Sequence, residues 1–179
     1  MLSLDPLGLD SAMLDEARAY LRVEPAEDDP SLAAAVMAAL GHAEQFTRTI
    51  LIRRNASEIL SACSGWQILE AVPVQSIAAV TGVPAEGARF LLANDAWEAK
   101  IGSHGDAYIR IINPGIAGRV EISCQSGLAP DWSSLPEILR LGVLRLAAHF
   151  YAHRDCATDA GPPAAARVLL LPWRRLRLI

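Results

Sequence analysis

Apolar side chains recur at helical spacing near both ends of this chain, and at strand spacing in the stretch between. Leu14 and Leu21 share one helical face, and Leu139 and Val143 share another. Residues 51–127 instead hold short β-type runs separated by Gly, Pro, Asn and Ser turns. These predicted strands are residues 51–52, 58–60, 66–69, 76–80, 88–92, 108–112 and 119–123. A helical period on both sides of a strand period predicts an α+β fold, with a small antiparallel β-module inserted between helices.

Capping and proline signals place the helix boundaries. Asp10 or Ser11 can cap the first helix, and Glu24 ends it because a residue before proline disfavours helical geometry. Pro30 and Pro136 suit the first turns of the second and third helices. The predicted helices cover residues 10–23, 31–50 and 136–154. The first two should pair as a helical hairpin joined by an acidic loop.

The domain prediction follows from this pattern. Residues 1–160 are predicted to form one domain that contains the three helices and the β-module. The sequence Gly161-Pro162-Pro163 is typical of a hinge, and residues 161–179 are predicted to be an extended C-terminal tail.

Charge is distributed unevenly along a net acidic chain. The formal net charge is −4, which argues against a general nucleic-acid-binding surface. Residues 1–30 hold eight acidic and two basic side chains, whereas residues 160–179 hold four arginines and no acid. The two ends could therefore attract unlike surfaces, on neighbouring copies or on a partner.

The sequence has no recognisable active-site motif. No G-x-S-x-G, P-loop or G-x-G-x-x-G pattern occurs, so neither an enzyme nor a cofactor site is predicted. His149 and His153 share a helical face, with Cys156 close behind. These residues leave one alternative open, a small metal-binding protein or metal-dependent enzyme. The segment lacks the Glu of H-E-x-x-H, so a structural or interface role for the histidines is favoured.

The C-terminal tail is rich in apolar residues and contains four arginines. Such a chain end must be buried somewhere, either against its own domain, on a membrane surface or on another protein. Trp and Arg are enriched at binding hot spots, which favours docking on another protein. The basic run is short, which disfavours a membrane surface. The predicted docking residues are Leu169, Leu170, Leu171, Trp173, Arg174, Arg175, Leu176, Arg177 and Leu178.

Three blocks of residues together resemble a known family. They are Leu14-Asp15-Glu16-Ala17-Arg18 with Ala43-Glu44-Gln45-Phe46-Thr47, then Pro136-Glu137-Ile138 with Ala147-Ala148-His149-Phe150-Tyr151, and finally Leu171-Pro172-Trp173-Arg174. In order and spacing they resemble the head–tail connector (adaptor) proteins of long-tailed phages and gene transfer agents.

The resemblance implies a structural part of a virion, assembled in the bacterial cytoplasm and without catalysis. Such adaptors form a ring, typically of twelve copies, beneath the portal protein. The ring joins the portal to the next tail-side connector or stopper and lines the DNA channel. The resemblance further implies that the tail docks on the portal. A net acidic body suits a conduit that does not hold DNA, since phosphate binding needs clustered Lys and Arg.

Overall fold

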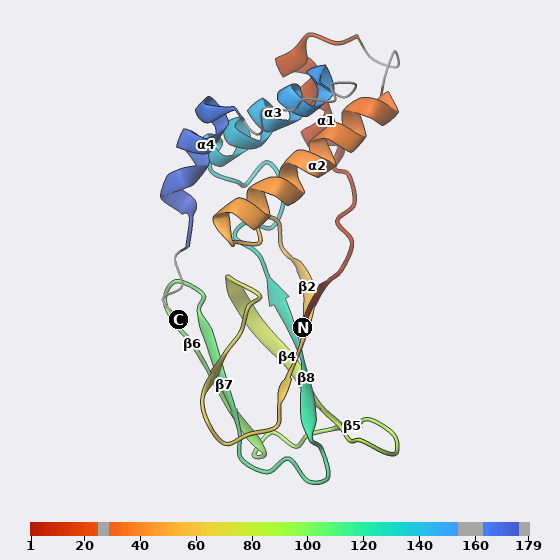
Figure 1. Cartoon of the computed structure of the whole chain (residues 1–179), viewed down its shortest axis with the longest axis vertical. Coiled ribbons are helices and arrows are strands. Elements are labelled where there is room, and N and C mark those ends of the chain that lie inside the picture. The colour runs from red at the N-terminus through yellow and green to blue at the C-terminus, as the bar shows by residue number, and fades with distance from the viewer. Residues whose placement is uncertain (25–28, 154–162, 176–179) are drawn as a thin grey trace. The chain divides into compact units, whose positions relative to one another are not determined.

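The computed structural model describes residues 1–24, 29–153 and 163–175 (Figure 1). The fold is α+β with antiparallel sheets, and the chain forms two compact units. The β unit consists of residues 1–7 and 52–128. The helical unit consists of residues 8–51 and the chain from Ala129 onward. The first seven residues precede the first helix in the chain but belong to the β unit. The single domain over residues 1–160 stays a prediction.

The helical unit contains the predicted helices and a further one. The elements are α1 (Ser11–Leu21), α2 (Asp29–Thr47), α3 (Glu137–Ala152), α4 (Ala164–Leu170) and the 3-10 helix η1 (Leu171–Trp173). The first three match the sequence prediction to within three residues at each end. Among the described helices, none has the length and apolar character needed to cross a bilayer.

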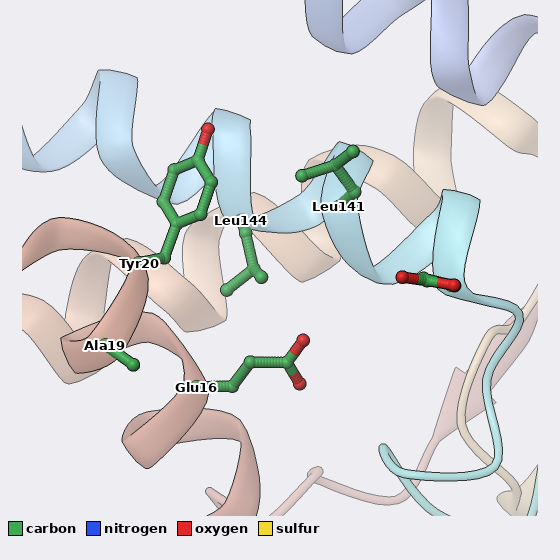
Figure 2. Close-up of a pocket in the computed structure, with 6 residues that line it drawn as sticks. Glu16, Ala19, Tyr20, Leu141 and Leu144 are labelled. Carbon is green, nitrogen blue, oxygen red and sulfur yellow. The ribbon is translucent and has the colours of Figure 1, made fainter.

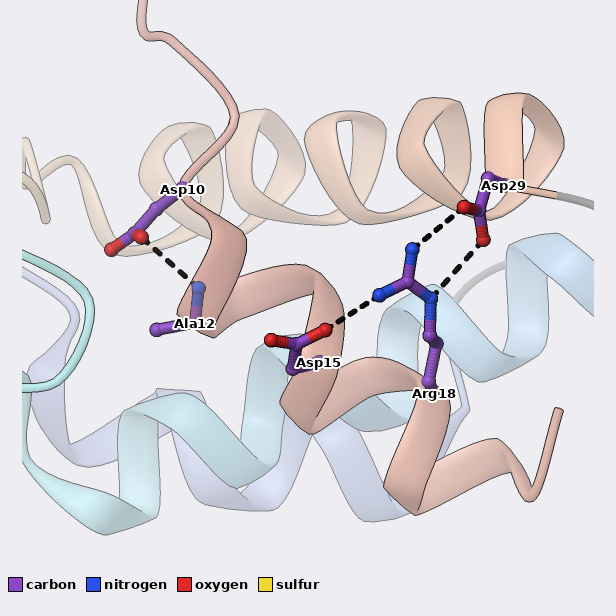
Figure 3. A network of polar contacts seen from close by, with 5 residues as sticks. All are labelled: Asp10, Ala12, Asp15, Arg18 and Asp29. Atoms are coloured by element: carbon purple, nitrogen blue, oxygen red, sulfur yellow. Dashed lines mark hydrogen bonds and ion pairs between the residues drawn. The ribbon is translucent and has the colours of Figure 1, made fainter. Parts of the chain in front are cut away.

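Local polar contacts fix the start of α1 and tie it to α2 (Figure 3). Asp10 caps α1, because its carboxylate accepts a 3.1 Å hydrogen bond from the backbone N–H of Ala12. Further along the helix, Arg18 donates to both carboxylate oxygens of Asp29, over 3.1 and 2.7 Å, and also pairs with Asp15. The bidentate bond joins the last turns of α1 to the first turn of α2.

Apolar faces of the helices form the core of the helical unit. Leu32, Val36 and Leu139 are fully buried, at the spacing that the sequence pattern predicts. In α1 the fully buried large side chain is Met13, whereas the predicted Leu14 and Leu21 are half-buried. Each side chain of this size contributes about 1.5–3 kcal/mol when it leaves water. Trp132 precedes α3 in the chain and is also buried.

The β unit contains two antiparallel sheets. Its strands are β1 (Leu2–Leu4), β2 (Arg54–Ser61), β3 (Gln67–Ile68), β4 (Val74–Val83), β5 (Phe90–Leu91), β6 (Trp97–Ile101), β7 (Ala107–Ile111) and β8 (Arg119–Ser126). The five-stranded sheet has the order β1-β2-β8-β4-β5, and the three-stranded sheet has the order β3-β7-β6. The sequence prediction missed β1 and β6.

A buried carboxyl group links two segments of the β unit. Glu58 of β2 is almost fully buried, and its Oε2 accepts hydrogen bonds from the backbone N–H groups of Glu70, at 2.8 Å, and Ala71, at 3.4 Å. Burial raises the pKa of Glu58, because the charged form loses its water. The bonds hold the segment after β3 against the larger sheet.

Gly127 follows β8 in a conformation that excludes other residues. Its φ is +147°, and a Cβ there would lie 2.3 Å from the Cα of Arg53. The close approach of two backbones therefore requires glycine.

Candidate partner-binding surfaces

The helix α4 packs against its own unit. Ala166 and Leu170 are buried, and Leu170 lies over Gly142 of α3. A Cβ at Gly142 would lie 2.9 Å from Leu170 Cδ2, so the missing side chain leaves room for the leucine. The Arg145 side chain also donates a 3.4 Å hydrogen bond to the carbonyl of Ala165.

The segment after η1 attaches to the end of α2. The Arg174 guanidinium lies 5.4 Å from the centre of the Phe46 ring, in a cation–π contact. The backbone N–H of Arg175 donates a 2.9 Å hydrogen bond to the Thr47 carbonyl. The expectation of an extended tail is therefore wrong for residues 163–175, because burial of Leu170 holds this part of the chain on α3.

The predicted docking residues differ in their accessibility. Leu170 is only 2% exposed, so its side chain is occupied within the helical unit. Leu171 is 50% exposed, and Arg174 is also exposed. Leu169, Trp173 and Arg175 are half-buried, while Leu176, Arg177 and Leu178 lie outside the described residues. The described part of the tail thus offers Leu171 and Arg174 as its most accessible candidates.

A second exposed surface lies on the outer side of α4. We call Ala164, Arg167 and Val168 the α4 outer face. These residues lie within about 100° around the helix; Val168 is opposite the buried Ala166 and Leu170, whereas Arg167 lies at the border of the face, about 60° from Leu170. Val168 is 67% exposed, and within the described residues no hydrogen bond or ion pair engages the Arg167 guanidinium. The face combines an apolar side chain with a cation.

The sequence prediction missed a groove between α1 and α3. This shallow pocket has a volume of about 250 Å³. Figure 2 shows the side chains that line it. We call it the α1–α3 groove, and it is lined by Glu16, Ala19, Tyr20, Glu137, Leu141 and Leu144. Tyr20, at 43% exposed, and the neighbouring Ile138, at 52%, extend its apolar surface. The sequence signal for this groove was the presence of large apolar side chains, such as Tyr20 and Leu141, outside the core-facing stripe of each helix.

The two carboxylates of the groove have different roles. Glu16 Oε2 accepts a 2.7 Å hydrogen bond from the Trp132 indole and lies 3.7 Å from Arg140, so it is held within the unit. Glu137 is exposed, and across the described ranges it has no hydrogen-bonding or ion-pair partner for its side chain. The groove therefore presents an apolar floor with one available negative charge.

The histidines stack on α3 and contact backbone. The His149 and His153 rings lie 4.4 Å apart, and His153 Nδ1 is 2.9 Å from the His149 carbonyl oxygen. Cys156, the third residue of the metal alternative, lies outside the described residues. Among residues 1–24, 29–153 and 163–175, no group of three or more potential ligands suits a metal ion. The metal-binding alternative gains no support from this geometry.

The whole chain is similar to solved neck structures of gene transfer agents. The neck of an empty gene transfer agent particle, computed with C6 symmetry, contains a chain that superposes with a TM-score of 0.80 and 26% identity. The match covers 100% of this chain and 97% of that one. A chain in the virion of a native gene transfer agent particle gives a TM-score of 0.77 at 27% identity, with coverage of 100% and 97%. The neck of a native particle, computed with C12 symmetry, gives 0.76 and 27%, with 99% and 97%. No protein-family model and no curated protein matches.

The class that this fold defines is that of structural proteins in a virion neck. Coverage is nearly complete on both sides, so the likeness includes the helical unit, the β unit and the C-terminal segment. The comparisons support the family that the sequence resembles, the head–tail connector proteins of phages and gene transfer agents.

Proposed function

We propose that this chain is an adaptor subunit that forms a ring and joins the portal of a phage-like capsid to the tail. The observation that carries the proposal is the full-length likeness to chains of gene transfer agent necks. Those necks are computed with C6 and C12 symmetry, and a ring of twelve copies is compatible with both. The chain acts as a structural part without catalysis.

In this proposal the ring lines a channel through which DNA passes without specific binding. The net charge of −4 supports a surface that does not retain phosphates. The next connector or stopper occupies the tail side of the ring. The particle is assembled in the bacterial cytoplasm.

Docking on the portal is assigned to the chain end beyond α4. Leu171 and Arg174 supply the exposed apolar and cationic contacts, with Trp173 and Arg175 beside them. Leu176, Arg177 and Leu178 complete the proposed site. Leu169 is half-buried beside this segment, and Leu170 supports it from beneath by packing on α3.

The experiment measures attachment of purified protein to portal-bearing heads that lack it. A deletion of residues 174–179 leaves α4 and η1 in place, and we expect it to abolish attachment while helical circular dichroism is retained. Leu171→Glu tests the same surface by a single exposed substitution, and it should weaken binding by about tenfold or more. The matched control is Ile112→Glu in the β unit, where Ile112 is 51% exposed against 50% for Leu171.

The outcomes test the adaptor role and the location of the portal-docking site separately. Attachment of both tail variants at the parental level would place portal docking elsewhere on the chain. Failure of the parent protein to attach to the heads would refute the adaptor role itself.

A further inference from the structure

The α4 outer face and the α1–α3 groove carry opposite charges, each beside apolar side chains. One presents Val168 beside an available cation, Arg167, and the other an apolar floor beside an available anion, Glu137. Opposite charges beside apolar groups set the register of a protein–protein contact. The α1–α3 groove, at about 250 Å³, is large enough to receive a valine side chain.

The two surfaces cannot meet within one helical unit. Gly142 contacts α4 and Leu144 lines the groove, and both belong to α3. Val168 lies on the side of α4 opposite the buried Ala166 and Leu170, so it points away from α3 and cannot reach the groove of its own copy. Two different surfaces of one chain that bind each other across copies form a head-to-tail contact, which generates a ring when the rotation closes.

We propose that the α4 outer face of one copy docks in the α1–α3 groove of the next copy, as a lateral contact of the ring. Val168 enters the depression beside Tyr20 and Leu141, and Arg167 pairs with Glu137 of the neighbouring copy. The inference rests on the proposed ring, and it adds the residues that join adjacent subunits. Leu171 is one turn from Arg167 and Val168 and borders this contact, and the residues after it are left for the portal.

The test uses charge reversals at exposed positions in the full-length chain. Glu137→Arg and Arg167→Glu each place like charges across every contact, so each variant alone should need about tenfold more protein, or more, to half-saturate heads with rings. The variant with both reversals restores opposite charges and should assemble as the parent does. Glu86→Arg and Arg119→Glu, exposed positions of the β unit, are the matched controls and should assemble normally.

A mixture of the two single variants gives the decisive result. In an alternating ring, the two substituted side chains would face each other with opposite charges at one contact, and the native Glu137–Arg167 pair would form at the next. An equimolar mixture should therefore form rings at concentrations where neither variant does so alone. Copies per head, measured by quantitative mass spectrometry, report the assembly.

The outcomes distinguish a neighbouring copy from other partners that could occupy these two surfaces. Normal rings from both single variants, or a mixture as defective as its components, would overturn the proposal. A mixture as defective as its components is the result expected if the portal, rather than a neighbouring copy, occupies either surface. Defects of equal size in the control variants would attribute the effect to net charge and would also overturn it. If the parent protein forms no rings on heads, the adaptor function fails first, and this contact fails with it.

Discussion

Gly142→Ala tests whether α4 is seated on α3 in solution. In a helix interior, alanine is more favourable than glycine by about 1 kcal/mol, so an unobstructed position would be stabilised. Here the added Cβ would lie 2.9 Å from Leu170 Cδ2 and 3.2 Å from its Cγ, closer than ordinary contact. Overpacking of a filled core costs about 1–3 kcal/mol. We therefore expect Gly142→Ala to change the free energy of unfolding by about 0–2 kcal/mol in the destabilising direction.

A second substitution removes the obstruction. Leu170→Ala should destabilise the protein by about 2–5 kcal/mol, because a buried leucine leaves a cavity. In that background the remaining close neighbour of the new Cβ is Leu169 Cβ at 3.6 Å, an ordinary contact. Gly142→Ala should then stabilise the protein by about 1 kcal/mol. The sign of the effect depends on the background, and the coupling is about 1–3 kcal/mol.

The assay is urea unfolding followed by far-ultraviolet circular dichroism, which reports the helices. Gly41→Ala in α2 is the control, since nothing lies within 4 Å of a Cβ at that position. It should stabilise the protein by about 1 kcal/mol in both backgrounds. If Gly142→Ala stabilises the parent as much as Gly41→Ala does, α4 is not seated on α3 and the reasoning fails.

Two further predictions concern the β unit. Burial raises the pKa of Glu58 above the ordinary 4.5, so its contribution to stability is present below pH 4.5 and is lost as pH rises through the raised value. Glu58→Gln should flatten that decline in urea midpoints, and an unchanged pH dependence would exclude Glu58 as its source. Gly127→Ala should cost about 3 kcal/mol or more, because its Cβ would overlap the Arg53 backbone. Gly115→Ala, with φ of +57° and its nearest neighbour at 3.6 Å, should cost only about 1–2 kcal/mol, and equal losses at both glycines would refute the steric argument.

The helices were predictable because their signals are local. Asp10 caps α1 as the sequence indicates, and the apolar stripes of α2 and α3 are the faces that the structure buries. In α1 the structure buries Met13 more deeply than the predicted Leu14 and Leu21. Caps and periodic stripes involve residues within a few turns of one another, so neighbouring sequence contains the information.

Strands β1 and β6 were missed by the sequence prediction because their stability comes from distant partners. Leu2–Leu4 is too short to show a period, and it is a strand only through pairing with β2, in which Leu2 lies opposite Glu58. Trp97–Ile101 carries Glu98 and Lys100 on its outward side, and it is defined by pairing with β7. Short edge strands gain their structure from pairing rather than propensity.

The candidate surfaces were only partly accessible to sequence reasoning. The arginine-rich end stood out as a surface that requires a partner, but its pattern did not reveal that Leu170 packs against Gly142. That contact depends on a missing side chain in another helix, which no local pattern reports. The α1–α3 groove likewise depends on how Tyr20 and Leu141 come together in space.

The chain leaves and re-enters the helical unit at a single place. The backbone N–H of Ala129 donates a 3.0 Å hydrogen bond to the carbonyl of Leu51, so the two ends of the intervening segment adjoin. Insertions are tolerated where the flanking ends are close, and the same geometry permits their removal. Excision of residues 52–128, with Leu51 ligated to Ala129 through a short glycine bridge and residues 1–7 omitted, should yield a minimal all-helical scaffold.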